Sequence, residues 1–309
     1  MHYIIGVDGG GTKTEAVAFS MNGDVIFKNV TGFGNVLVDE TKALENIIEA
    51  IDGCIKGVYE KNREIRCIFI CAGLAGVEVG NYSIIIKQKI EDYFKVRTKV
   101  VNDAVIAHAS LLKGEDGIIT VSGTGSISIG KRENEIVRAG GWGHILGDEG
   151  SGYHIALKAL KKAVNEYDMG CKESPLTLNI MKKLNIKRVE EIKDFVYKSD
   201  KASIASLVPV IVESSCYDLY AKQILIDAAN ELSEITYMVA KKLNMFNNVK
   251  IGIKGSVLTK VDIVRENFEK FLSRKLKKVD LIDEDVPSTK GAFYLALLEY
   301  SKLAGDSNV

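Results

Sequence analysis

Ile5-Gly-Val-Asp8-Gly9-Gly10-Gly11-Thr12-Lys13-Thr14 is the stretch that decides the fold of this chain. A short apolar run ends at an aspartate and a glycine-rich turn, and Ala16-Val17-Ala18-Phe19 then forms a second strand-like run. Glycine has no Cβ, so it can take positive φ and let backbone N–H groups approach an anion closely. The stretch therefore predicts a β-hairpin whose turn binds phosphate, with an unliganded glycine turn as the alternative.

The polar side chains around this turn fit phosphate chemistry. Thr12 and Thr14 supply hydroxyl donors, and Lys13 supplies a positive charge. Asp8 has the wrong sign to hold phosphate directly, so we expect it to act through a Mg²⁺ ion between itself and the phosphates. The residue order differs both from a Walker A loop and from a G-x-G-x-x-G loop.

A second copy of the pattern begins at Ile118 and runs through Ser122-Gly123-Thr124-Gly125 into another strand-like run. Aligned on the first copy, Ser122 matches Asp8 and Gly123 matches Gly9. Both copies lead into a third strand-like run. A repeated strand–loop–strand unit suggests two related subdomains on either side of a nucleotide. Only the first copy carries the aspartate, so the metal is assigned to that half.

Composition indicates an ordered globular protein. The 309 residues are 46% hydrophobic and 27% charged, with few prolines and a formal net charge of zero. Without a basic block, nucleic acid is an unexpected partner. No apolar run approaches the length of a membrane span, and the N-terminus does not resemble a signal peptide. We therefore expect a cytoplasmic protein with room for two domains.

The five cysteines are odd in number and show no C-x-x-C spacing, which favours reduced thiols. Cys67 and Cys71 share one strand-like run. Their spacing of four predicts that both side chains lie on the same face of the strand. Packing is the favoured explanation, and metal binding is the alternative.

The alternation of strands and helices predicts an α/β fold with mainly parallel pairing outside the hairpins. Helices are expected at 41–62, 83–94, 153–164, 221–243 and 290–303, and the block 171–215 also has a helical pattern. We place an N-terminal sugar and phosphate domain at 1–115 and a C-terminal nucleotide-binding domain at 116–309. This division leaves open that the last helix packs back on the first domain.

Asp103 follows a short strand and begins a helix. An N-cap would explain an aspartate at this position. The functional alternative is a carboxylate at the carboxyl end of a strand, where ligands of open α/β sheets bind. There it would accept a proton from a substrate hydroxyl.

The segment 140–152 holds six glycines, the only tryptophan of the chain, His144, and the adjacent acids Asp148 and Glu149. A flexible loop rarely carries such side chains. The two acids could favour the dipole of the following helix. A sugar-binding loop explains more, because carboxylates accept hydrogen bonds from vicinal hydroxyls and glycines let the backbone approach a ring. His144 is interpreted as structural.

Together these motifs resemble the sugar kinase, Hsp70 and actin superfamily, and most closely the N-acetylglucosamine kinase branch of the BadF/BadG/BcrA/BcrD ATPase family. The likeness covers nearly the whole chain. Gly255-Ser256-Val257 resembles the adenosine motif, and Gly140-Gly-Trp-Gly with Leu146-Gly-Asp-Glu-Gly-Ser151 resembles the sugar loop of N-acetylhexosamine kinases. The resemblance implies two ribonuclease H-like, actin-like ATPase domains that flank a nucleotide and sugar cleft.

The resemblance also implies roles for individual residues. Asp103 corresponds to the general base, and Asp8 to the aspartate on the metal side. The phosphates and adenosine of ATP are assigned to Gly10, Gly11, Thr12, Lys13, Ser122, Gly123, Thr124, Gly125, Gly255 and Ser256. The sugar is assigned to Asn35, Gly73, Asp103, Gly141, Trp142 and Asp148.

The implied activity is ATP-dependent phosphorylation of the C6 hydroxyl of an amino sugar, with Mg²⁺, by a homodimer. N-acetylglucosamine is the first choice, and N-acetylmuramic acid and glucosamine follow. A rival is an ATPase that activates a dehydratase or reductase through an iron–sulfur cluster, but no cysteine pair suits a cluster. A third is a sugar-sensing regulator, which usually carries a DNA-binding helix-turn-helix.

Overall fold

The glycine turn at the start of the chain joins two strands at the centre of a mixed sheet in the computed structural model, which describes residues 2–133 and 135–305. The sheet has the order β3-β2-β1-β4-β5. β1 pairs antiparallel with β2 and parallel with β4, and β5 extends the parallel part. Its strands are β1 (His2–Gly9), β2 (Thr14–Ser20), β3 (Val25–Thr31), β4 (Arg66–Leu74) and β5 (Thr98–Asn102).

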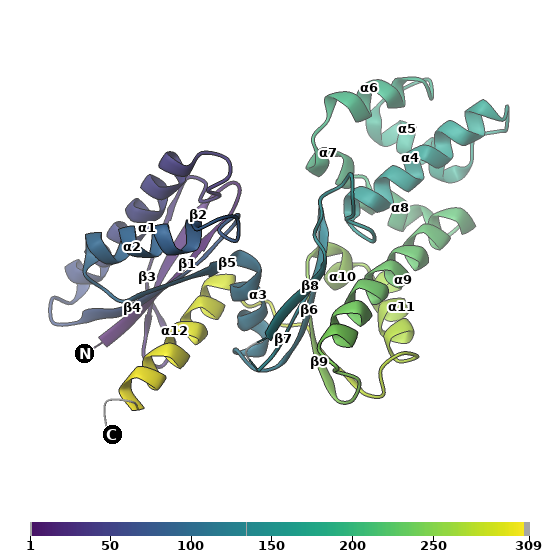
Figure 1. Cartoon of the computed structure of the whole chain (residues 1–309). Coiled ribbons are helices and arrows are strands. Elements are labelled where there is room, and N and C mark those ends of the chain that lie inside the picture. The colour runs from purple at the N-terminus through teal and green to yellow at the C-terminus, as the bar shows by residue number, and fades with distance from the viewer. Residues whose placement is uncertain (1, 134, 306–309) are drawn as a thin grey trace. The chain divides into compact units, whose positions relative to one another are not determined.

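Two helices cover each face of this sheet (Figure 1). One face packs against α1 (Glu40–Lys61) and α2 (Tyr82–Phe94), and the other against α3 (Asp103–Leu112) and α12 (Ser288–Gly305). The α1 face buries aliphatic side chains such as Ile47 and Ile51 at helical spacing. These elements make up unit 1, formed by the described residues of 1–115 and 284–309.

The described residues of 116–283 form unit 2, whose sheet repeats the same strand order, β10-β9-β6-β7-β8. Here β6 is the central strand, antiparallel to β7 and parallel to β9. Its strands are β6 (Gly117–Ser122), β7 (Ser126–Arg132), β8 (Glu135–Gly140), β9 (Val249–Lys254) and β10 (Val279–Ile282). The duplicated strand–loop–strand pattern is thus confirmed at the level of topology.

Helices build the rest of unit 2 and share one hydrophobic core with its sheet. They are α4 (Gly152–Asp168), α5 (Pro175–Leu184), α6 (Glu191–Lys198), α7 (Lys201–Ala205), α8 (Val208–Ser214), α9 (Leu219–Lys242), α10 (Ser256–Lys260) and α11 (Asp262–Leu272). The block 171–215 is helical, as the pattern predicts. The sequence pattern missed α10, α11 and β10.

The prediction for Cys67 and Cys71 is wrong. The pairing of β1 with β4 shifts between Tyr3 and Ile4, so Ile68 is the extra residue of a β-bulge. The bulge reverses the alternation of side chains beyond it. Cys67 therefore packs with the α1 face of the sheet, and Cys71 packs with the α3 face.

Candidate functional site

In unit 1, the predicted site residues collect at the carboxyl ends of the parallel strands. Asp8 on β1 is level with Gly73 on β4, and Gly73 is level with Val101 on β5. Asp103 begins α3 directly after β5. Two strand spacings separate β1 from β5, or about 10 Å. Asp8 and the first turn of α3 therefore belong to the same edge of the sheet.

The turn after β1 is a compact loop with an exposed tip. The Gly10 N–H donates to the Lys13 carbonyl at 3.0 Å, and Gly11 and Thr12 are exposed. Among the described glycines, positive φ occurs elsewhere and not at Gly9, Gly10 or Gly11. The glycines here permit close packing instead, because a Cβ on Gly9 would lie 2.6 Å from a Leu74 methyl.

One polar side chain of this turn, Thr14, does not lie where the sequence pattern suggested, and another, Lys13, already has a charged partner. Thr14 is fully buried, and a Cβ on Gly34 would lie 2.5 Å from its hydroxyl oxygen, so Thr14 does not line the open side of the turn. The Lys13 ammonium pairs with Glu15 at 3.1 Å, and Lys28 pairs with the same carboxylate at 2.9 Å. Lys13 is nevertheless largely exposed and can reach beyond the loop.

Asp103 is the first helical residue of α3 and not its N-cap. The cap is Asn102, whose side-chain oxygen accepts from the Ala104 N–H at 2.9 Å. Burial raises the pKa of the Asp103 carboxyl, and the negative charge of Glu78 raises it further. The N-cap explanation of Asp103 is therefore wrong, and its carboxylate has the higher proton affinity that suits a base.

The two other unit 1 residues assigned to sugar binding lie next to this edge. Gly73 has no room for a side chain, because a Cβ would overlap with Ile106 of α3. Asn35 follows the Gly34 turn, and its side-chain oxygen accepts from the Leu37 N–H at 3.0 Å. A Cβ on Gly76 would lie 3.0 Å from that oxygen. Asn35 is thus held near the segment that follows β4.

In unit 2, the loop between β6 and β7 rests on the start of α4. The Gly152 N–H donates to the Gly123 carbonyl at 2.7 Å, and the Tyr153 N–H donates to the Thr124 carbonyl at 3.3 Å. The Ser122 hydroxyl is buried and donates to the Gly150 carbonyl at 2.8 Å. The Ser122 hydroxyl is therefore occupied within the fold, while Thr124 is exposed.

The predicted adenosine motif touches this loop directly. Gly255 has φ +86, and a Cβ there would overlap with the Ser122 carbonyl oxygen and lie 2.9 Å from the Gly123 nitrogen. Only glycine takes this conformation at this spacing without strain. Ser256 follows as the exposed first residue of α10. The two motifs, more than a hundred residues apart, form one surface.

A cavity of about 590 Å³ opens on that surface. It is a suitable size for a small ligand and is mainly apolar. Its lining combines both motifs with α7, α8 and α10 and consists of Gly123, Thr124, Gly152, Ala202, Ala205, Ser206, Val208, Pro209, Val212, Glu213, Ser256, Val257, Lys260 and Val261. Sequence reasoning missed the wall from 202 to 213, because this helical block carries no recognisable motif.

Asp148 is buried against the same loop. One carboxylate oxygen accepts from the Ser126 N–H at 3.2 Å, and the other accepts from the Lys201 ammonium at 2.7 Å. A Cβ on Gly125 would lie 3.0 Å from this carboxylate. Asp148 has positive φ, which aspartate tolerates better than most residues. Lys201 of α7 was not foreseen from the sequence.

The rest of the segment 140–152 is an irregular loop before α4. Trp142 is 62% exposed, and the Arg138 guanidinium stacks 4.5 Å from its ring. Gly141 has φ +71 and its N–H donates to the Ser126 carbonyl at 3.0 Å. The exposed His144 packs edge-on against Tyr153.

The helix-dipole alternative for Asp148 and Glu149 is wrong. α4 begins at Gly152 with Ser151 as its cap, so both acids precede the helix. The Ser151 hydroxyl accepts from the His154 N–H at 3.2 Å and satisfies the first turn.

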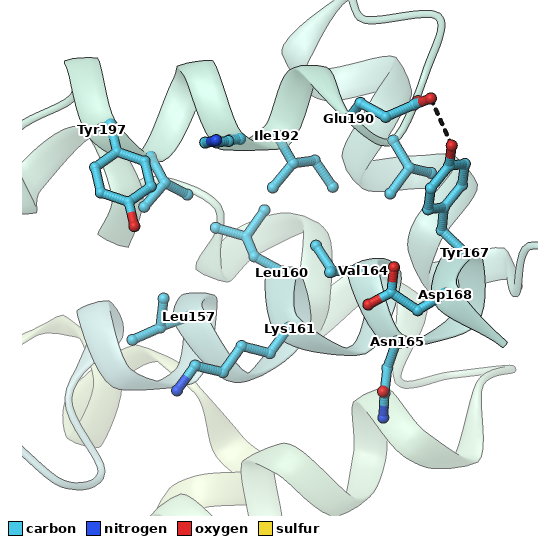
Figure 2. A pocket seen from close by; sticks show the side chains of 13 residues that line it. Leu157, Leu160, Lys161, Val164, Asn165, Tyr167, Asp168, Glu190, Ile192 and Tyr197 are labelled. Carbon is cyan, nitrogen blue, oxygen red and sulfur yellow. Dashed lines mark hydrogen bonds between the residues drawn. The ribbon is translucent and has the colours of Figure 1, made fainter.

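A larger cavity lies elsewhere in unit 2, between α4 and α6, and has a volume of about 740 Å³ (Figure 2). Its floor is aliphatic, with Leu157, Leu160 and Ile192 pointing inward. The Tyr167 hydroxyl donates to Glu190 at 2.7 Å across one end. None of the predicted site residues lines it.

Two further observations concern ions and membranes. In the described part of the chain, no three His, Cys, Asp or Glu side chains form a metal-binding group. Mg²⁺ commonly uses only one or two protein carboxylates together with substrate phosphates and water, so a single aspartate such as Asp8 is compatible with a Mg²⁺ site. No single helix of residues 2–133 and 135–305 has the length and hydropathy of a membrane span, although the bent pair Lys201–Ser214 and Leu219–Lys242 passes by length and composition alone.

Two units with the same five-stranded order, each with a glycine loop after its central strand, define an α/β protein of the actin-like sugar kinase fold. Residues 5–294 match the BadF/BadG/BcrA/BcrD ATPase family, and the chain belongs to it.

The chain resembles characterised relatives along nearly its whole length. It is 34% identical over 308 residues to an N-acetylmuramic acid/N-acetylglucosamine kinase of Clostridium acetobutylicum, covering 97% of this chain and 99% of the relative. It is 30% identical to an N-acetyl-D-glucosamine kinase of Dictyostelium discoideum, covering 95% and 97%. A solved structure from Chromobacterium violaceum, provisionally named an N-acetylglucosamine kinase, matches with a TM-score of 0.71 at 23% identity, covering 96% and 98%.

Proposed function

We propose that this protein is an ATP-dependent kinase that phosphorylates the C6 hydroxyl of an N-acetylhexosamine. N-acetylglucosamine is the first candidate, with N-acetylmuramic acid and glucosamine next. The names of the full-length relatives support an amino sugar as the acceptor. The observation that carries the proposal is Asp103, a carboxylate of raised pKa at the sheet edge where ligands of α/β folds bind.

Asp103 is proposed as the base that accepts the proton of the attacking hydroxyl. Asn102 caps α3, so the Asp103 carboxylate is not needed for that purpose. A raised pKa increases the proton affinity of the Asp103 carboxylate, which is the property a general base requires. Asn35 and Gly73 are proposed to position the sugar beside it. Asp148 is proposed as a ligand of a sugar hydroxyl and Trp142, with Gly141, as the wall for the acetamido group.

The nucleotide is assigned to the glycine loops and to the 590 Å³ cavity of unit 2. Gly123, Thr124 and Ser256 all line this cavity, and we assign the first two to the phosphates and Ser256 to the adenosine. In unit 1, the loop from Gly10 to Lys13 is assigned to the phosphates. Asp8 would hold Mg²⁺, which would neutralise charge on the transferred phosphoryl group. Alignment of the reactants is expected to supply most of the rate enhancement.

The remaining parts of the proposal concern context. We assign the main sugar and phosphate functions to residues 1–115 and the nucleotide-binding function to 116–309, of which the last helix, α12, belongs to unit 1. We also propose a homodimer, a cytoplasmic location and a role in recycling cell-wall amino sugars. The buried Cys54 and Cys71 and the half-buried Cys67 support a reduced state, because burial raises the pKa values of their thiols. Neither nucleic acid nor a membrane is a proposed partner.

The experiment is an ADP-release assay with N-acetylglucosamine, N-acetylmuramic acid, glucosamine and glucose, with and without EDTA. Sugar-dependent ADP release that EDTA abolishes is expected, with a 6-phosphate identified by NMR. Asp103→Asn should lower kcat by about 10²–10⁴-fold while ATP still binds. ATP hydrolysis independent of every sugar, or a brown and oxygen-sensitive preparation, would contradict the proposal, and the second result would favour the iron–sulfur activator.

A further inference from the structure

The strongest unassigned contact near Asp103 comes from Glu78, in the segment that follows β4. A Glu78 carboxylate oxygen accepts from the Asn102 side-chain nitrogen at 2.6 Å. The Asn102 side-chain oxygen accepts from the Ala104 N–H at 2.9 Å. Because the amide nitrogen can only donate and its oxygen can only accept, these two bonds fix the orientation of the Asn102 side chain.

The two residues joined by this capping bond, Asn102 and Ala104, are the sequence neighbours of Asp103. Asp103 lies between the capping residue Asn102 and Ala104, whose N–H also donates to an Asp103 carboxylate oxygen at 2.9 Å. If Asn102 turned away, Asp103 would be the remaining side chain able to cap this turn. The Ala104 N–H, now shared between the Asn102 and Asp103 side chains, would then be left to the Asp103 carboxylate alone. The Glu78 contact therefore bears on the orientation of Asp103 although it does not touch it.

Resting on the proposed function, we propose that Glu78 is a positioning residue for Asp103. Glu78 holds the Asn102 cap in place and adds a negative charge beside the proposed base, Asp103. The segment that carries Glu78 is well anchored. The Ala75 N–H donates to the Gly9 carbonyl at 2.9 Å, and the Val36 N–H donates to the Ala75 carbonyl at 3.4 Å. These bonds hold Ala75, three residues before Glu78, beside the glycine loop and the Asn35 turn, whereas Glu78 itself is exposed.

The charged groups on the elements around Asp103 bear on the effect that Glu78 has on the pKa of Asp103. β1 contributes Asp8 to the same edge, and the segment after β4 contributes Glu78. α12, which packs along α3, carries Lys290 and Glu299. Lys290 donates to the Gly23 carbonyl, and Glu299 pairs with Lys99 at 2.6 Å. The acidic Glu78 raises the pKa of Asp103, so its loss should lower that pKa.

Two substitutions separate the effect of the hydrogen bond to Asn102 from the effect of the Glu78 charge. Glu78→Gln keeps a side-chain oxygen for Asn102 and removes the charge, whereas Glu78→Ala removes both. Glu45→Gln is the matched control, because Glu45 is an exposed glutamate on α1 that pairs with Lys42. The measurements are the pH dependence of kcat/KM for the sugar and an NMR titration of the Ala104 amide, with Asp103→Asn identifying the Asp103 titration. The NMR measurement does not depend on kinase activity.

Both Glu78 variants should move the acidic limb of kcat/KM and the Ala104 titration to lower pH, while Glu45→Gln moves neither. Glu78→Gln should keep kcat within about threefold at the plateau, and Glu78→Ala should lose about tenfold with an unchanged KM for ATP. An unmoved titration, or wild-type kcat in Glu78→Ala, overturns the proposal. A shifted titration in an enzyme that phosphorylates none of the sugars supports the positioning of Asp103 and overturns the proposed function instead.

Discussion

The Lys201 ammonium lies 2.7 Å from a carboxylate oxygen of Asp148, a residue 53 positions earlier in the chain. The Asp148 side chain is 5% exposed and the Lys201 side chain 35%. This ion pair fastens α7 to the loop between β6 and β7, because the other Asp148 oxygen accepts from the Ser126 N–H. A region without any sequence motif is thereby tied to a predicted nucleotide loop.

Lys201→Met should lower the free energy of unfolding by about 1–3 kcal/mol, because it leaves a buried carboxylate with one charged partner fewer. The control is Lys198→Met. Lys198 pairs with Asp194 at 3.0 Å, but both side chains are about three-quarters exposed, so less than about 1 kcal/mol is expected. Urea denaturation of both variants provides the measurement. Equal losses would show that the Asp148 pair is no stronger than a surface pair.

Gly255→Ala should destabilise unit 2 and weaken ATP binding. The new methyl group would overlap with the Ser122 carbonyl, and φ +86 disfavours any Cβ. We expect a loss of about 2–4 kcal/mol in stability. Gly123→Ala provides a contrast, since nothing lies within 4 Å of its added Cβ. It should keep the stability within about 0.5 kcal/mol and raise the KM for ATP. Thermal unfolding and ATP titrations distinguish the two.

Trp142 is the only tryptophan of the chain and is 62% exposed, so its fluorescence reports on one loop. If it lines the acetamido pocket, N-acetylglucosamine should shift its emission to shorter wavelength and protect it from acrylamide quenching. Glucose, which lacks the acetamido group, should have a smaller effect at the same concentration. An emission spectrum unchanged by saturating N-acetylglucosamine would remove Trp142 from the sugar site.

The cysteines should fall into two reactivity classes. Cys171 and Cys216 are exposed, and they should react with a thiol reagent such as DTNB within minutes in the native protein. Burial raises the pKa of Cys54 to about 11 and the pKa values of Cys67 and Cys71 to about 12, so few thiolates form there. Native protein should therefore release two equivalents quickly, and all five only in denaturant. A third fast equivalent would contradict the packing of this core.

Much of the fold was predictable because local patterns specify it. The apolar residues of α1 recur at helical spacing, and the glycine loops follow apolar strands, so periodicity alone located these elements. The face occupied by Cys71 was not predictable, since it depends on one inserted residue in the pairing of β4 with β1. A bulge is decided by the partner strand, which the local sequence does not contain.

The candidate site was predictable only in part, for a similar reason. The motifs located Asp8, Asp103 and Gly255 at strand ends. The partners that determine their surroundings are distant or lack a motif. Glu78 reaches Asn102 from another loop, and Lys201 reaches Asp148 from the helical block. The Asn102 side chain that caps α3 also donates to Glu78, a contact that the sequence around Asn102 does not contain.

The return of α12 to unit 1 has a consequence for synthesis of the protein. Ala292, Phe293 and Ala296 of α12 complete the cluster around Ile4, Phe19 and Ile106. A ribosome makes the whole of unit 2 before it makes these residues, so the part of this face that α12 covers stays exposed until α12 has been synthesised. Nascent chains halted before residue 284 should therefore expose Phe19 and Phe69 to chaperones, even where unit 2 has already folded.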